Sequence, residues 1–102
     1  MLGYVIGDGD MVTGFKLVGI DGIEVTSGDQ AWQEINKALS RADLAFIVIS
    51  EDFSRQAHIQ ETIDNARLEQ RRPLIVELPG SRGKPSQTRM SDIISKTLGV
   101  KL

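Results

Sequence analysis

The hydrophobic residues of the chain gather in four short runs, separated by longer segments in which they recur at helical spacing. Short apolar runs that alternate with polar residues or contain β-branched residues are typical of strands. The pattern therefore predicts strands over residues 2–6, 23–26, 44–49 and 74–78. The run 44–49 is apolar without interruption, which predicts a central strand that is buried on both faces of a sheet.

Helices are predicted in the segments between and after these strands. Apolar residues three or four positions apart line one face of each segment, and capping residues or glycines mark its ends. The predicted helices cover residues 11–18, 30–42, 51–70 and 87–98. In the second of them Trp32 lies on the apolar stripe, so it is predicted to be a core residue and not an exposed stacking platform.

Strands and helices alternate along the whole chain, and this alternation predicts the fold class. We expect a single α/β domain over residues 1–102, with a doubly wound, mostly parallel four-stranded sheet in the order 2-1-3-4 and helices on both faces. Residues 80–86, rich in Gly and Ser, are expected to form a flexible loop. Residues 87–102 are expected to form the C-terminal helix and tail, and whether that helix moves stays an open question.

Composition narrows the function mainly by exclusion. Hydrophobic residues make up 40% and charged residues 25% of the 102 residues, as in ordinary globular domains. The chain has no cysteine, which excludes disulfides and thiolate chemistry. Because the formal net charge is −2 and we expect both signs to be mixed along the chain, no electrostatic footprint for nucleic acid is predicted. No apolar run approaches the roughly 20 residues of a membrane span, so we expect a cytoplasmic protein without direct membrane insertion.

Acidic residues follow the first and third predicted strands. Asp8 and Asp10 come after the first strand, and Ser50 and Glu51 come after the third. In an open α/β sheet these positions share the carboxyl edge, where ligands tend to bind. The acid pair is similar to that of a phosphorelay receiver domain, but a serine stands where the phosphoacceptor is required and no lysine lies in the fourth strand. Two interpretations of Asp8 and Asp10 stay open. They complement the dipole at a helix N-terminus, or they form the site of a stand-alone pseudo-receiver or small-ligand regulatory domain.

The remaining motifs predict no catalytic, cofactor or metal site. The glycines at 7–14 and 80–84 miss the spacing of dinucleotide and phosphate-binding loops. His58 is the single histidine and has no cysteine partner, so neither a metal site nor a catalytic triad is predicted. A small basic cluster, either a solvated loop or a docking site for an acidic partner, is formed by Arg82, Lys84 and Arg89.

Two further segments resemble a known family. The sequence Gly-Phe-Lys-Leu-Val-Gly-Ile at residues 14–20 resembles the Gly-Phe-Arg-Leu-Ala-Gly signature of the F subunit of archaeal-type and bacterial V-type ATP synthases. The ending Lys-Thr-Leu-Gly-Val-Lys-Leu at residues 96–102 is similar to that family's C-terminus, and Pro73 precedes the fourth strand as it does there. Lys16 departs from the commoner arginine, and the loop 80–86 is more basic than the family leads us to expect.

The resemblance implies a non-catalytic component of the rotating central stalk, peripheral to the membrane within the ATP synthase. It would bind the coiled-coil D subunit of the stalk and, transiently, the catalytic A/B ring, and so couple ion translocation to ATP synthesis or hydrolysis without binding nucleotide. Whether H⁺ or Na⁺ is moved, and in which direction the complex runs, stays open. On this basis we expect partner contacts from the last helix and its surroundings, by Phe15, Arg89, Met90, Ile94 and Val100, although all except Arg89 are equally compatible with core packing.

Overall fold

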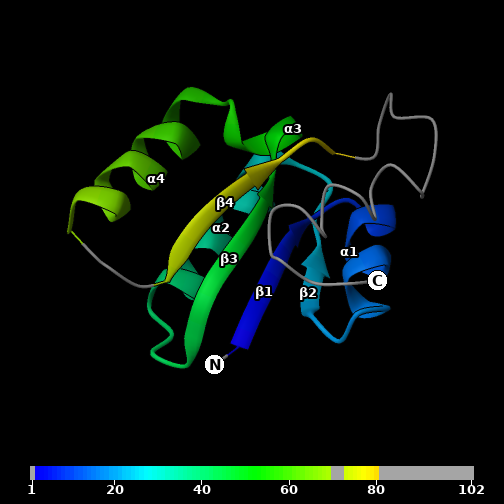
Figure 1. Ribbon diagram of the computed structural model, residues 1–102. Helices are drawn as coiled ribbons and strands as arrows, with labels where there is room; N and C mark the ends of the chain where they lie inside the picture. Colours follow the sequence, from blue (N-terminus) through cyan, green and yellow to red (C-terminus); the bar gives the residue numbers. More distant parts are fainter. Residues whose placement is uncertain (1, 70–72, 81–102) are drawn as a thin grey trace.

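The chain folds into one four-stranded sheet flanked by helices, in a computed structural model that describes residues 2–69 and 73–80 (Figure 1). Strands and helices alternate as the hydrophobic pattern predicts. In chain order the elements are β1 (Leu2–Gly7), α1 (Gly9–Lys16), β2 (Asp21–Glu24), α2 (Gly28–Leu39), β3 (Leu44–Ser50), α3 (Glu51–Ser54), α4 (Ala57–Glu69) and β4 (Leu74–Leu78). The predicted loop from Ser81 onward and the predicted last helix lie outside the described residues.

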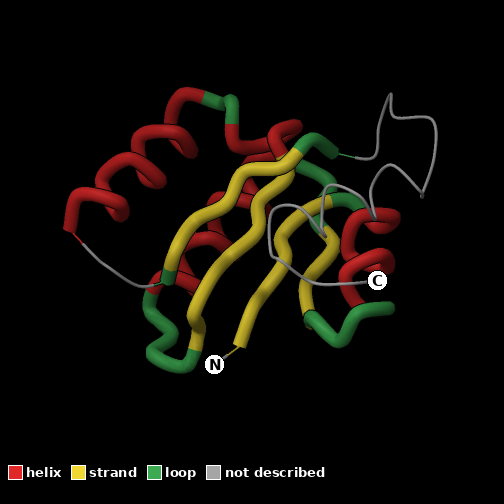
Figure 2. Tube along the Cα trace, viewed as in Figure 1, coloured by secondary structure: helices red, strands yellow, loops and turns green. Residues whose placement is uncertain are grey.

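The sheet is parallel throughout, and its strand order β2-β1-β3-β4 confirms the predicted order 2-1-3-4 (Figure 2). β3 lies in the interior of the sheet, as its continuous apolar run predicts. Its side chains alternate between two hydrophobic clusters: Val48 packs on the side of α1, while Ile47 and Ile49 pack on the side of α2 and α4. The helices thus cover both faces, which confirms the doubly wound α/β architecture.

The first two helices begin earlier than predicted because their capping residues lie farther upstream. The Asp8 carboxylate accepts a hydrogen bond from the Met11 N–H, and the Ser27 hydroxyl accepts one from the Gln30 N–H. Each of these residues satisfies a backbone donor that the first turn leaves free. Helix α1 therefore runs over residues 9–16 and α2 over residues 28–39.

The single helix predicted over residues 51–70 is two helices in the structure. α3 forms one turn, capped by the Ser50 hydroxyl, which accepts a hydrogen bond from the Asp52 N–H at 3.2 Å. α4 then starts at Ala57 and buries Ile59 and Ile63. The separate turn also buries Phe53 in the cluster beneath α2 and α4. None of the helices in the described ranges is long and apolar enough to cross a membrane.

Candidate partner-binding surfaces

The carboxyl edge of β1 is occupied by side chains of the protein itself. Asp8 caps α1 through Oδ1, which lies 3.0 Å from the Met11 nitrogen. The Glu24 carboxylate, at the end of β2, lies so close to Gly9 that a Cβ there would come within 3.0 Å of Oε2. The N-terminus of a helix attracts anions. Here two carboxylates of the chain already lie at that position.

The carboxyl edge of β3 is filled in the same way. Ser50 is fully buried, and its hydroxyl caps α3. Gly80, just after β4, packs against it so closely that a Cβ would lie 2.7 Å from the Ser50 Oγ and would also meet the Asp52 carboxylate. Asp10 is exposed on the first turn of α1. Among residues 2–69 and 73–80 no three Asp, Glu or His residues are grouped so that they could hold a metal ion.

Trp32 is exposed over 42% of its surface, so the prediction that it is a core residue is wrong. The buried line of α2 runs through Ala31, Ile35 and Ala38, and Trp32 lies beside this line on the flank that faces α4. Its indole Nε1 donates a hydrogen bond to the Thr62 Oγ1 at 3.1 Å. The helical pattern contained a partial signal, because residue 32 lies at the edge of the apolar stripe and not at its centre.

His58 completes the contact between the two helices. The Thr62 hydroxyl donates to the His58 carbonyl at 3.0 Å, which orients its oxygen toward the indole. The His58 ring lies 6.3 Å from the Trp32 ring, centroid to centroid, at an interplanar angle of 56°. His58 itself is exposed. The two helices therefore present an indole and an imidazole side by side at the surface.

A second exposed apolar region lies on the sheet face that α1 covers. α1 lies beside β1 and β2 (Figure 1). Its buried residues pack with Val48 and Leu78. On β3 and β4 the same face carries Phe46 and Val76, which are only partly buried. Leu74, paired with Phe46 in the register, is 64% exposed. No helix of the described ranges is assigned to this half of the face.

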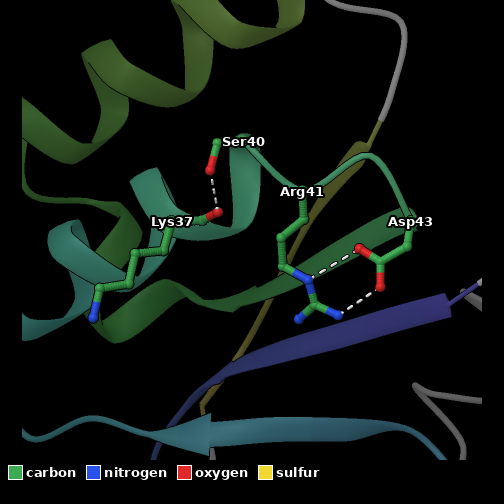
Figure 3. Close-up of polar contacts among 4 residues, drawn as sticks. All are labelled: Lys37, Ser40, Arg41 and Asp43. Atoms are coloured by element: carbon green, nitrogen blue, oxygen red, sulfur yellow. Dashed lines mark hydrogen bonds and ion pairs between the residues drawn. The ribbon is translucent and has the colours of Figure 1, made fainter.

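At the end of the sheet opposite the carboxyl edge, polar residues stabilise the loop that connects α2 to β3 (Figure 3). Arg41 and Asp43 form a two-pronged ion pair, with Nε to Oδ1 at 3.0 Å and Nη2 to Oδ2 at 2.8 Å. These hydrogen bonds hold the pKa of the exposed Asp43 carboxyl below its usual value. The Arg41 guanidinium also lies 5.2 Å from the centroid of the Tyr4 ring, and burial raises the pKa of that phenol. These polar groups therefore stabilise the fold at this end of the sheet.

The predicted contact residues fall into two groups. Phe15 is fully buried in the cluster between α1 and the sheet, which agrees with the core-packing alternative left open for it. Arg89, Met90, Ile94 and Val100 lie outside the described residues, so their expected role stays a prediction. Sequence reasoning missed the Trp32 contact with Thr62, because the two residues are 30 positions apart and only the packing of α2 on α4 brings them together.

Comparison with known proteins identifies the family. Residues 4–96 match the family described as ATP synthase (F/14-kDa) subunit. The chain is 33% identical to the F subunit of the A-type ATP synthase of Methanothermobacter thermautotrophicus, over 96% of this chain and 92% of that one. It is 31% identical to the F subunit of the V-type ATP synthase of Clostridium botulinum, over 96% and 93%.

A solved structure agrees with these sequence matches. The crystal structure of the F subunit of the V-type ATP synthase from Archaeoglobus fulgidus superimposes with a TM-score of 0.61 at 28% identity, and covers 76% of this chain and 95% of that one. Fold and sequence therefore agree with the family resemblance noted in the sequence. The chain belongs to the F-subunit family of A-type and V-type ATP synthases.

Proposed function

We propose that this chain is a non-catalytic component of the central stalk of an A/V-type ATP synthase. In this role it binds the coiled-coil D subunit of the stalk and, transiently, the catalytic A/B ring, and so helps to couple ion translocation to ATP synthesis or hydrolysis. The observation that carries the proposal is the family match over residues 4–96, which leaves little of the 102-residue chain outside it.

At the carboxyl edge of the sheet, polar side chains form hydrogen bonds within the chain itself, and this supports a role in binding proteins rather than small ligands. Asp8 and Ser50 cap helices, and Gly80 packs against the Ser50 hydroxyl. A regulatory site for Mg²⁺ or phosphate at this edge would need these groups to be turned toward a ligand. A small domain whose polar groups serve its own fold can still act through its outer surface, as a stalk component must.

The contacts proposed for the coiled coil come from the end of the chain. Arg89, Met90, Ile94 and Val100 are our candidates there, because apolar residues at helical spacing next to a basic residue suit a helix that packs on another helix. Phe15, the fifth candidate, is fully buried in the core, so its side chain is not exposed to a partner in this structure.

The test is co-purification of the full chain with the stalk coiled coil, analysed by size-exclusion chromatography with light scattering. The proposal predicts a stable 1:1 complex that is weakened when Met90 and Ile94 are both replaced by Asp. A chain that stays monomeric beside the coiled coil, and instead gains thermal stability with Mg²⁺ or a phosphate analogue, would overturn the stalk role and favour the regulatory alternative.

A further inference from the structure

Acidic and basic residues are separated along the chain to a degree that the net charge hides. Residues 1–69 hold 12 of the 14 acidic residues but only five of the 12 Lys and Arg residues, a formal charge of −7, whereas residues 70–102 hold two acidic and seven basic residues, a formal charge of +5. The even mixing of charges expected from the sequence is wrong. An excess of acidic residues attracts cationic groups.

The basic residues within residues 2–69 and 73–80 are mostly engaged already. Arg41, Arg55 and Arg67 form ion pairs with Asp43, Glu51 and Glu77. Lys37 pairs with Glu34 at 3.3 Å. On α2 and α4, by contrast, Asp29 and Glu61 are exposed and form no ion pair within the described part of the chain. Their charges are available to an incoming group.

These two acids lie within one helical turn of the residues that join α2 to α4. On α2, residues 29, 32 and 36 are three and four positions apart, so they share one strip of the helix, and Trp32 reaches α4 through Thr62. On α4, residues 58, 61 and 65 share a strip in the same way, and it includes His58, whose ring lies 6.3 Å from that of Trp32. We define the Trp32 surface as these six residues, Asp29, Trp32, Asn36, His58, Glu61 and Asn65, all of which are exposed.

The indole at the centre of this surface is held in position before any partner arrives. Its Nε1 donates to Thr62, and the Asn36 side chain donates to the Trp32 carbonyl at 2.8 Å. A fixed aromatic ring loses little conformational freedom on binding, and tryptophan is among the residues enriched at binding hot spots. Its face also attracts Arg and Lys side chains.

We propose that the Trp32 surface docks a basic helix of a partner protein, with an arginine or lysine over the indole and further cations near Asp29 and Glu61. This inference rests on the proposed function, under which the partner is the stalk coiled coil. It adds a second contact, on α2 and α4, to the one assigned to the end of the chain. The surface offers acids, amides and one aromatic ring, a combination that matches a cationic helix better than an apolar one.

Trp32 is the single tryptophan of the chain, so its fluorescence reports on this surface directly. The experiment titrates the full chain with the stalk coiled coil, in which any tryptophan has been replaced by phenylalanine, and follows emission and acrylamide quenching. Formation of the complex is measured in parallel by light scattering. The proposal predicts a blue shift and reduced quenching when the complex forms, because the exposed 42% of the side chain becomes covered.

Variants test the same contact without relying on fluorescence. We expect Trp32→Ala to weaken the affinity by at least about tenfold. Glu61→Lys should weaken it by a similar factor and remove part of its salt dependence, and it remains informative if Trp32→Ala does not fold. The matched control is Asp21→Lys at the start of β2, which makes the same charge change at an exposed position on an edge strand, outside the two helices that carry the Trp32 surface.

The outcomes separate this inference from the proposed function. A complex that forms with unchanged Trp32 fluorescence and unchanged affinity of both variants would overturn the docking surface and leave the stalk role standing. Failure of the wild-type chain to form any complex would overturn both. In the free chain, acrylamide quenching that rises with added salt would show that the basic residues of the C-terminal segment cover the surface, and would also contradict the proposal.

Discussion

The carboxyl edge of the sheet and the Trp32 surface carry similar residue types but use them in opposite ways. At the edge, Asp8 and Ser50 accept hydrogen bonds from the backbone, and Gly80 packs closely on Ser50. On α2 and α4, Asp29 and Glu61 have no ion pair in the described ranges, and Trp32 is partly open to solvent. Polar groups that serve the fold contribute stability, and those left unpaired at the surface are available for recognition.

The largest loss of stability is expected from a substitution in the core between α1 and the sheet. Phe15→Ala removes a fully buried ring from the cluster of α1 and the sheet and should lower the free energy of unfolding by about 3–5 kcal/mol. Urea denaturation followed by circular dichroism measures the loss. If stability is unchanged while binding to the stalk coiled coil is lost, Phe15 is a contact residue and the distinction between the two regions fails.

A smaller loss of stability is expected when a side chain is added at Gly80, which packs closely at the carboxyl edge of the sheet. Gly80→Val places a side chain against the buried Ser50 hydroxyl, where even a Cβ would lie at 2.7 Å. Because Ser50 is fully buried, we expect this overpacking to lower the free energy of unfolding by about 1–3 kcal/mol. The measurement is the same denaturation experiment, with Gly14→Val as a comparison for the side chain alone, since a Cβ at Gly14 meets nothing within 4 Å. Equal losses in the two variants would contradict close packing at the edge.

On the Trp32 surface, a third prediction concerns the hydrogen bond that holds the indole in position. Thr62→Val deletes the hydroxyl that accepts from Nε1 and should cost about 0.5–1.5 kcal/mol of stability. Acrylamide quenching of Trp32 should rise, because the ring is no longer fixed. Thr13→Val, the same change at an exposed position of α1, is the control. Unchanged quenching in Thr62→Val would show that other contacts hold the ring.

The smallest effect is expected at the ion pair of Arg41 and Asp43. Arg41 lowers the pKa of Asp43 below its usual 3.8, so the pair's contribution is complete above that pH and is lost as the pH falls through the lower, folded-state pKa. Arg41→Gln should move the pKa of Asp43 back toward 3.8 and remove this part of the acid dependence. A carbon-detected NMR titration of the carboxyl measures it. An unchanged titration would mean that the pair is not formed in solution.

Much of the fold could be predicted because each element is specified locally. The continuous apolar run of β3 and the alternation of strands with helical stripes lead to the parallel sheet and its order. The main error is the single helix predicted over residues 51–70, which is two helices in the structure. The break after Ser54 buries Phe53 together with Ile59, and a single regular stripe could not reveal it.

The candidate surface was less predictable than the fold. Trp32 lies only one position from the buried Ala31, so its exposure depends on where α4 packs, which is tertiary information. Charge segregation, in contrast, is visible in the sequence and is lost only when charges are summed over the whole chain. The ion pairs that leave Asp29 and Glu61 unmatched become visible only in the fold.

The most direct test of the account is to compare how tightly three full-length proteins bind the stalk coiled coil, measured by isothermal titration calorimetry: wild type, Asp8→Ala and Trp32→Ala. Asp8→Ala loses a helix cap, about 0.5–2 kcal/mol of stability, but should bind as the wild type does. Trp32→Ala should bind at least about tenfold more weakly. The opposite pattern, with binding lost in Asp8→Ala and kept in Trp32→Ala, would place the interaction at the carboxyl edge and contradict the account.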